Sequence, residues 1–349
     1  MEKEKINLGL FTSVYSYFLF LLLKGYNKND IIIVHDSFPK ELSKNINPII
    51  VPVVMFKYGN IKQSISKLGI KQIIIGFFKY LSNYIKLRIL LFTKTFNKKV
   101  ENYGHTFSLY SFMFYENENS NIIEDGLMNY TNDICETHKI NPIIDKFLHL
   151  FGIYFLNLNE TFGSHKNIKK IYLTNEFNHP LIKDKVEVIN MNELWNKLSK
   201  NKKEEILNLF NIDLDNYDFD DETVLILTQQ FDGTMSLDEE LNIYKEFIDM
   251  FKEYSIIIKP HPRDNKNYNE IFPNIKTING YFPIELLNLI GIKPKIICTV
   301  LSTAAMNFQG SKIYIYEGKI KNEFINNARN SLIELIEKQD KAVLIKKNN

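Results

Sequence analysis

The chain has 349 residues, enough for two domains, and its 45% hydrophobic and 24% charged residues are ordinary for a globular protein. A formal net charge of +2 leaves no domain-wide basic field, so the composition argues against nucleic acid as the main partner. The two cysteines, Cys135 and Cys298, lie far apart and in no CxxC or CxxH spacing. They predict neither a zinc site nor a disulfide framework, and they fit a reducing compartment.

The first apolar segment, residues 8–23, resembles a transmembrane span or a signal peptide. Three hydroxyl residues interrupt it, it is short for a transmembrane span, and no small-residue cleavage site follows it. We therefore favour a strand over residues 6–11, a turn at residues 12–13, a helix that ends near Lys24, and a second strand over residues 30–35. This pattern predicts a βαβ unit, and a transmembrane anchor is the alternative.

The rest of the N-terminal half alternates apolar strands with helical patterns. A long helical stretch, residues 61–96, mixes aromatic and aliphatic residues with lysines. Such a helix can lie on an anionic membrane surface, or it can pack its apolar stripe on the core or on a second subunit. A charged helix is expected over residues 190–210. Strands are expected over residues 49–54, 107–114, 122–123 and 171–174.

A second alternating run occupies the C-terminal half. Strands separated by helices predict two doubly wound parallel sheets, one in each half of the chain. The expected strands are residues 223–228, 255–259, 295–300 and 312–316, and the expected helices are residues 238–254, 283–289 and 304–308.

The most informative motif is Lys-Pro-His-Pro-Arg, residues 259–263, which ends an isoleucine-rich strand. The two prolines end the strand because neither can donate a backbone N–H to the sheet. His261 is therefore expected at the carboxyl end of a strand, where open α/β sheets bind their ligands. Lys259 and Arg263 make the position cationic and suited to a phosphate. The alternative is a turn whose histidine has no chemical role.

Two other strand ends carry carboxylates. Glu124-Asp125-Gly126 follows one short strand, and Asp232-Gly233 follows another. Glycine permits a tight turn there, and an ordinary turn is the alternative for each motif.

Hydroxyl and carboxylate residues also stand at two predicted helix starts. Ser302 and Thr303 follow the strand 295–300, where hydroxyls and free N–H groups bind a phosphate or carboxylate. Glu285 lies in the first turn of the helix 283–289, which the helix dipole favours in any case. Plain capping is the alternative for Ser302 and Thr303.

In this order the motifs resemble the bacterial sialyltransferases of glycosyltransferase family 52, which cap lipooligosaccharide or capsule with sialic acid. The resemblance covers most of the chain and is densest between residues 223 and 308. It implies an α/β fold of the GT-B type, with two Rossmann-like domains facing a central cleft. Residues 1–185 would form the acceptor-side domain, and residues 186–349 the CMP-donor-binding domain. It also implies transfer from CMP-sialic acid with inversion, with no cofactor and no metal.

The resemblance also implies roles for the singled-out residues. His261 would protonate or neutralise the departing phosphate, and the general base would be Asp232 or one of the pair Glu124 and Asp125. The expected donor-binding residues are Lys259, Arg263, Glu285, Ser302, Thr303 and Gly126.

The implied partners are CMP-sialic acid and an oligosaccharide acceptor on a glycolipid or capsule repeat. A cytoplasmic location, peripheral contact with the inner face of the membrane and a homodimer are further expectations. The nearest enzymatic alternatives are a glucosyltransferase and a transferase like the CDP-glycerol phosphotransferases. A catalytically silent saccharide- or nucleotide-binding protein is the alternative from a different class.

Overall fold

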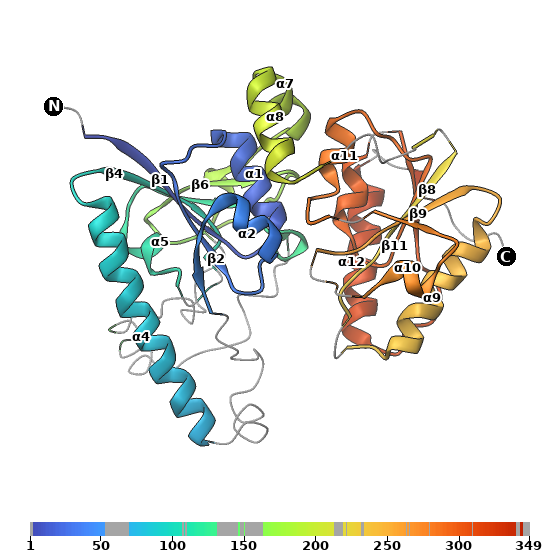
Figure 1. Cartoon of the computed structure of the whole chain (residues 1–349), viewed down its shortest axis with the longest axis horizontal. Coiled ribbons are helices and arrows are strands. Elements are labelled where there is room, and N and C mark those ends of the chain that lie inside the picture. Colours follow the sequence, from blue (N-terminus) through green and yellow to red (C-terminus); the bar gives the residue numbers. More distant parts are fainter. Residues whose placement is uncertain are drawn as a thin grey trace. The chain divides into compact units, whose positions relative to one another are not determined.

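The computed structural model divides the chain into two compact units, Met1–Ile206 and Leu207–Asn349 (Figure 1). The structure describes residues 3–52, 70–106, 108, 110–130, 146, 150, 163–212, 219–220, 222–231, 234–262, 264, 266–278, 280–308, 310–339 and 343–344.

The first unit contains a parallel sheet of seven strands in the order β3-β2-β1-β4-β5-β6-β7. The strand order reverses between β1 and β4, which is the topological switch point of a doubly wound sheet. The strands are β1 (Lys5–Phe11), β2 (Ile31–His35), β3 (Ile49–Val51), β4 (Lys99–Gly104), β5 (Ser120–Ile123), β6 (Ile168–Leu173) and β7 (Val186–Val188).

The helices of this unit include α1, which confirms the predicted βαβ start. Ser13 caps α1 by accepting a 3.1 Å hydrogen bond from the backbone N–H of Ser16, and Gly25, at φ +74°, ends it. Among the described residues, no helix is long and apolar enough to cross a membrane. The helices are α1 (Val14–Lys24), α2 (Lys40–Ile46), α4 (Ile70–Thr95), α5 (Phe112–Glu116) and α7 (Met191–Lys197), with short 3₁₀ turns at Leu127–Tyr130 and Lys183–Lys185. The boundary between the two units falls within α8 (Lys200–Leu209).

The predicted strand over residues 107–114 is wrong. The strand beside β1 is β4, and α5 begins at Phe112. β4 was not predicted from its sequence, KVENYG, because the polar Asn102 occupies a buried position of the strand. The side-chain amide of Asn102 donates to the Met113 carbonyl at 2.7 Å. The aromatic residues of α5 pack into the core from a short helix instead.

The boundary between the units, after Ile206, differs from the predicted domain boundary at residues 185/186. β7 pairs with β6 and completes the first sheet, and α7 packs on α1. Both elements therefore belong to the first unit.

The second unit contains a parallel sheet of six strands in the order β10-β9-β8-β11-β12-β13, so its switch point lies between β8 and β11. Two doubly wound sheets are thus confirmed. The strands are β8 (Thr223–Leu227), β9 (Ser255–Lys259), β10 (Lys276–Thr277), β11 (Ile296–Thr299), β12 (Lys312–Ile315) and β13 (Val343–Leu344). The helices are α9 (Leu237–Met250), α10 (Tyr268–Ile271), α11 (Glu285–Leu289) and α12 (Glu323–Gln339), with a 3₁₀ helix, η5, at Thr303–Asn307.

Candidate functional site

In the first unit, Asp125 is held at the carboxyl edge of the sheet. The Thr12 hydroxyl donates to Asp125 Oδ2 at 2.6 Å, and the Ser13 hydroxyl donates to Asp125 Oδ1. The backbone N–H of Asp125 donates to Asn129 Oδ1 at 2.8 Å. Gly126 follows at φ +113°, a conformation that favours glycine. The carboxylate is therefore fixed by the ends of β1 and β5, and it stays half-buried.

Glu124 has a different environment from its neighbour, because it is only 2% exposed. Its Oε2 accepts hydrogen bonds from the Tyr130 hydroxyl at 2.7 Å and from the backbone N–H and hydroxyl of Thr174 at 2.6 and 2.7 Å. Burial raises the pKa of Glu124, although these hydrogen bonds oppose the shift. Glu124 therefore ties β5 to the end of β6, and Asp125 is the accessible carboxylate of the pair.

His105 is a candidate that sequence reasoning missed. It directly follows β4, between the strand ends that carry Ser13 and Asp125, and is 3% exposed. Burial lowers the pKa of His105, and the nearby Asp125 carboxylate opposes that shift. A histidine immediately after a strand would have identified His105 as a candidate, but β4 itself was not predicted.

In the second unit, His261 lies at the carboxyl end of β9, as predicted. Its backbone N–H donates to the Thr228 hydroxyl at 3.0 Å, and its carbonyl accepts from the Asp264 N–H at 2.8 Å. Thr228 follows β8, and its own N–H donates to the Lys259 carbonyl at 3.2 Å. The loop is thus tied to the neighbouring strand, and the His261 side chain remains half-buried.

Lys259 lies beneath this loop rather than on its surface. It is 3% exposed, and its ammonium donates to the carbonyls of Gly280 at 2.9 Å and Pro260 at 3.1 Å. The Phe282 ring centroid is 4.7 Å from Lys259 Nζ. Burial lowers the pKa of Lys259 to about 7, and the Glu285 carboxylate opposes the shift. Its contacts connect Pro260, in the histidine loop, to the Gly280 segment, so its contribution to the loop is structural.

A buried polar network supports the same loop from the other side. The Asp264 side chain is 1% exposed, and its Oδ2 accepts from the Tyr268 hydroxyl at 2.7 Å and from the Thr228 hydroxyl at 3.3 Å. Lys266 Nζ lies 3.1 Å from both Asp264 Oδ1 and Glu240 Oε1. Sequence reasoning missed this network, although Asp264 and Lys266 closely follow the Lys-Pro-His-Pro-Arg motif.

Ser302 and Thr303 lie at the end of β11, on the same sheet edge as His261. The Ser302 N–H donates to the Thr299 hydroxyl at 2.9 Å. The segment that follows is the 3₁₀ helix η5 rather than an α-helix, and both Ser302 and Thr303 are half-buried. Glu285 begins α11 and is 5% exposed. Asp232 and Arg263 lie outside the described residues, so their roles stay predictions.

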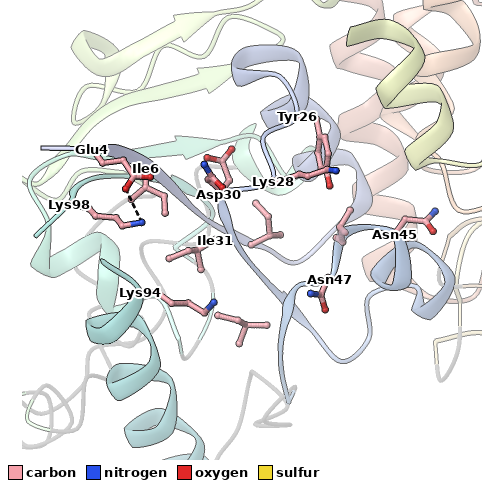
Figure 2. Close-up of a pocket in the computed structure, with 14 residues that line it drawn as sticks. Glu4, Ile6, Tyr26, Lys28, Asp30, Ile31, Asn45, Asn47, Lys94 and Lys98 are labelled. Carbon is pink, nitrogen blue, oxygen red and sulfur yellow. Dashed lines mark ion pairs between the residues drawn. The ribbon is translucent and has the colours of Figure 1, made fainter. Parts of the chain in front are cut away.

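A pocket of about 530 Å³ lies at the amino ends of the strands of the first sheet, opposite the edge that carries Asp125 (Figure 2). Its walls come from the amino ends of β1, β2 and β3 and from the end of α4. Figure 2 shows Asp30, Tyr26, Lys94 and the ion pair between Lys98 and Glu4 around it. None of the predicted site residues line this pocket. Within the described part of the chain, no group of three His, Cys, Asp or Glu residues is placed to hold a metal ion.

Comparison with known proteins identifies a family and a related protein. The model of the family described as Glycosyltransferase family 52 matches residues 47–323. An uncharacterized protein of Haemophilus influenzae is 34% identical over 222 residues, which cover 62% of this chain and 68% of that protein.

Two solved structures are similar over nearly the whole chain. The α/β-galactoside α-2,3-sialyltransferase of Photobacterium phosphoreum is 13% identical with a TM-score of 0.50, covering 98% of each chain. The GT-B domain of a sialyltransferase from Photobacterium damselae is 12% identical with a TM-score of 0.56, covering 97% of this chain and 99% of that domain. At these identities the likeness establishes the fold, which is of the GT-B type.

Proposed function

The chain belongs to glycosyltransferase family 52, and on that basis we propose that it moves sialic acid from CMP-sialic acid to a sugar hydroxyl with inversion. The expected acceptor is a terminal galactose-type hydroxyl of lipooligosaccharide or capsular polysaccharide. The observation that carries this proposal is the placement of His261, a half-buried histidine fixed by its backbone at the carboxyl end of β9. That the similar GT-B structures include sialyltransferases supports the choice of donor.

The proposed chemistry at the donor follows from the leaving group. CMP departs as a phosphate monoester, so negative charge grows on one phosphate during transfer. His261 donates a proton to that phosphate or neutralises it. The hydroxyls of Ser302 and Thr303, at the neighbouring strand end, bind the phosphate or the sialic acid carboxylate. Glu285 holds the cytidine ribose, and Arg263 adds positive charge.

Lys259 was expected to bind the CMP donor, but in this scheme it does not contact the donor. Its ammonium is occupied by the Gly280 and Pro260 carbonyls. It acts by fixing Pro260, directly before His261, against the Gly280 segment, so that the histidine is held where it meets the phosphate. Lys259 is therefore proposed as a positioning residue.

A carboxylate must take the proton of the acceptor hydroxyl as that oxygen attacks. We favour Asp125, because Thr12 and Ser13 orient it while it remains half-buried. Glu124 is less suited, because it is buried and its Oε2 already accepts from Tyr130, in the 3₁₀ turn after β5, and from Thr174, directly after β6. Asp232 remains the alternative base. In this proposal the first unit binds the acceptor and the second binds the donor, at the inner face of the membrane.

Ligand-dependent thermal stability tests the choice of donor. A ligand that binds the native state raises its melting temperature, so CMP should stabilise the full chain more than CDP or UDP at equal concentration. Slow release of free sialic acid from CMP-sialic acid without acceptor is also expected. Stronger stabilisation by UDP or CDP would favour the glucosyl- or glycerol-phosphate-transferring alternatives. Stabilisation by CMP without any turnover of CMP-sialic acid would indicate a silent binding protein.

A further inference from the structure

The pocket in Figure 2, here called the amino-edge pocket, lies at the end of the first sheet opposite Asp125 and takes no part in the proposed reaction. Its volume of about 530 Å³ is in the range of pockets that bind small molecules. Nine of the fourteen residues that line it have polar or charged side chains, and the other five are isoleucines. This composition favours a hydroxylated ligand over an apolar one, because polar groups covered by an apolar ligand would lose their hydrogen bonds to water.

Hydrogen bonds of the fold hold the walls of the amino-edge pocket in place. The backbone N–H of Lys99 donates to the Glu4 carbonyl at 2.9 Å, which ties the start of β4 to the start of β1. Directly before β2, Asp30 Oδ1 accepts from the side-chain amide of Asn7 at 3.0 Å and from its backbone N–H at 3.3 Å. α2 ends at Asn47, whose φ of +46° turns the chain toward β3. The pocket is therefore pre-formed.

The pocket carries an excess of positive charge. Lys94 and Lys98 line it from the end of α4 and the turn that follows, and Lys28 lines it from the turn before β2 (Figure 2). Lys98 pairs with Glu4 at 3.2 Å. Lys28 and Lys94 form no ion pair with a described residue. Since Asp30 is the second acid, three lysines line the pocket beside two carboxylates, and an anionic group on a ligand would be attracted to the two unpaired lysines.

Asp30 and the asparagines of the pocket supply groups that suit hydroxyls. The Oδ2 atom of Asp30 is buried and accepts no hydrogen bond from a described residue. Buried polar atoms are rarely left without a partner, so this oxygen is an acceptor that a ligand or a water can satisfy. A neutral hydroxyl fits it, because a second anion there would be repelled. Asn29 and Asn47 add side-chain amides that both donate and accept.

We propose that the amino-edge pocket binds a small anionic sugar. Its acid group would lie near Lys28 and Lys94, and its hydroxyls would lie near Asp30 and the asparagines. The isoleucines would pack against the apolar face of the sugar ring. A sugar with a carboxylate, such as free sialic acid, and a hexose phosphate share this chemistry. The proposal does not rest on the proposed function, because this pocket lies at the opposite end of the sheet from Asp125.

Isothermal titration calorimetry of the full chain with sialic acid and with galactose 6-phosphate tests the site. We expect at least one of them to bind, and the stronger ligand identifies the acid group as a carboxylate or a phosphate. Galactose, which has no charge, and inorganic phosphate, which has no ring, should bind about tenfold more weakly or less. Failure of both sugar acids to bind, or equal binding of inorganic phosphate or galactose, would overturn the proposal.

Paired lysine variants locate the binding site. Lys28→Gln with Lys94→Gln should weaken binding of the sugar acid about tenfold or more, because two charged donors are removed. The matched control is Lys79→Gln with Lys86→Gln, two exposed lysines of α4 outside the pocket, and it should bind like the wild type. Equal weakening in both pairs would overturn the proposal, because the effect would then come from overall charge.

A variant of the second unit separates this site from the proposed donor site, where sialic acid could also bind. Ser302→Ala should leave the affinity for the sugar acid unchanged. Weaker binding in Ser302→Ala, without weakening in Lys28→Gln with Lys94→Gln, would assign the bound sugar to the donor site and overturn the proposal. Turnover at saturating CMP-sialic acid should not change in Lys28→Gln with Lys94→Gln, so this test stands apart from that of the proposed reaction.

Discussion

The Thr228 hydroxyl accepts a 3.0 Å hydrogen bond from the backbone N–H of His261, so the end of β8 sets the position of the histidine at the end of β9. The same hydroxyl donates to the buried Asp264 carboxylate at 3.3 Å. One side chain thus connects the histidine loop to the network beneath it. Because parallel strands end at one edge of the sheet, this contact depends on the register in which Leu227 lies beside Lys259.

Removing the Thr228 hydroxyl should therefore slow turnover without abolishing donor binding. Thr228→Val keeps the shape of the side chain but deletes a hydrogen bond that contributes about 1 kcal/mol. We expect kcat to fall roughly fivefold with little change in KM for the donor. Thr228→Ser retains the hydroxyl and should restore most of kcat, as steady-state kinetics would show. Equal kcat in Thr228→Val and wild type would mean that this contact does not position His261.

Replacing the histidine itself should have a larger effect. His261→Ala should lower kcat by about 10²–10⁴, the usual effect of losing an acid or base group. The fold should survive, because a half-buried side chain on a loop contributes little to the core, and circular dichroism can check this. His179→Ala, in the loop before β7, is the matched control and should keep normal turnover. Near-full turnover in His261→Ala would remove His261 from the mechanism.

The two adjacent carboxylates should respond differently to neutral substitution. Asp125→Asn should lose transfer while still binding CMP in a thermal-shift assay, because the acceptor loses its base. Glu124→Gln should instead lower the free energy of unfolding by about 1–3 kcal/mol, since a buried acceptor is replaced by an amide. Urea denaturation and transfer kinetics on both variants separate these effects. Wild-type transfer in Asp125→Asn would shift the proposed role to Asp232.

Lys259 should make stability depend on pH. Its pKa is lowered by burial from 10.5 to about 7 in the native state, so between these values the unfolded chain binds more protons than the native chain. The free energy of unfolding should therefore rise with pH over that window and fall as pH drops through about 7. The slope from this one group is at most about 1.4 kcal/mol per pH unit. Urea denaturation of wild type and Lys259→Met at several pH values tests this, and parallel curves would contradict the assignment.

Elements with a plain apolar pattern were predictable from sequence. β9, with three consecutive isoleucines, and α1, with its Ser13 cap, occur where expected. β4 was not predictable by the same logic, because its buried Asn102 is satisfied by partners on α5 and β5 that only the fold brings near. β13 was missed because two residues carry too little pattern.

The candidate site was likewise only partly predictable from sequence. The position of His261 followed from two prolines and a strand, both of which are local signals. The burial of Lys259 did not, because it depends on Gly280 and Phe282, which lie about twenty residues further along the chain. The difference between Glu124 and Asp125 likewise arises from Thr174, a residue at the end of another strand.

Transfer to a simple acceptor tests the central claim most directly. The full chain would be incubated with CMP-sialic acid and lactose in excess EDTA, and the product analysed by mass spectrometry and NMR. We expect sialyllactose with inverted anomeric configuration, and formation in EDTA, because one departing phosphate can be neutralised by His261 and neighbouring hydrogen-bond donors. Failure to form any sialylated product, together with transfer from a nucleoside-diphosphate sugar that EDTA stops and Mg²⁺ restores, would contradict the account.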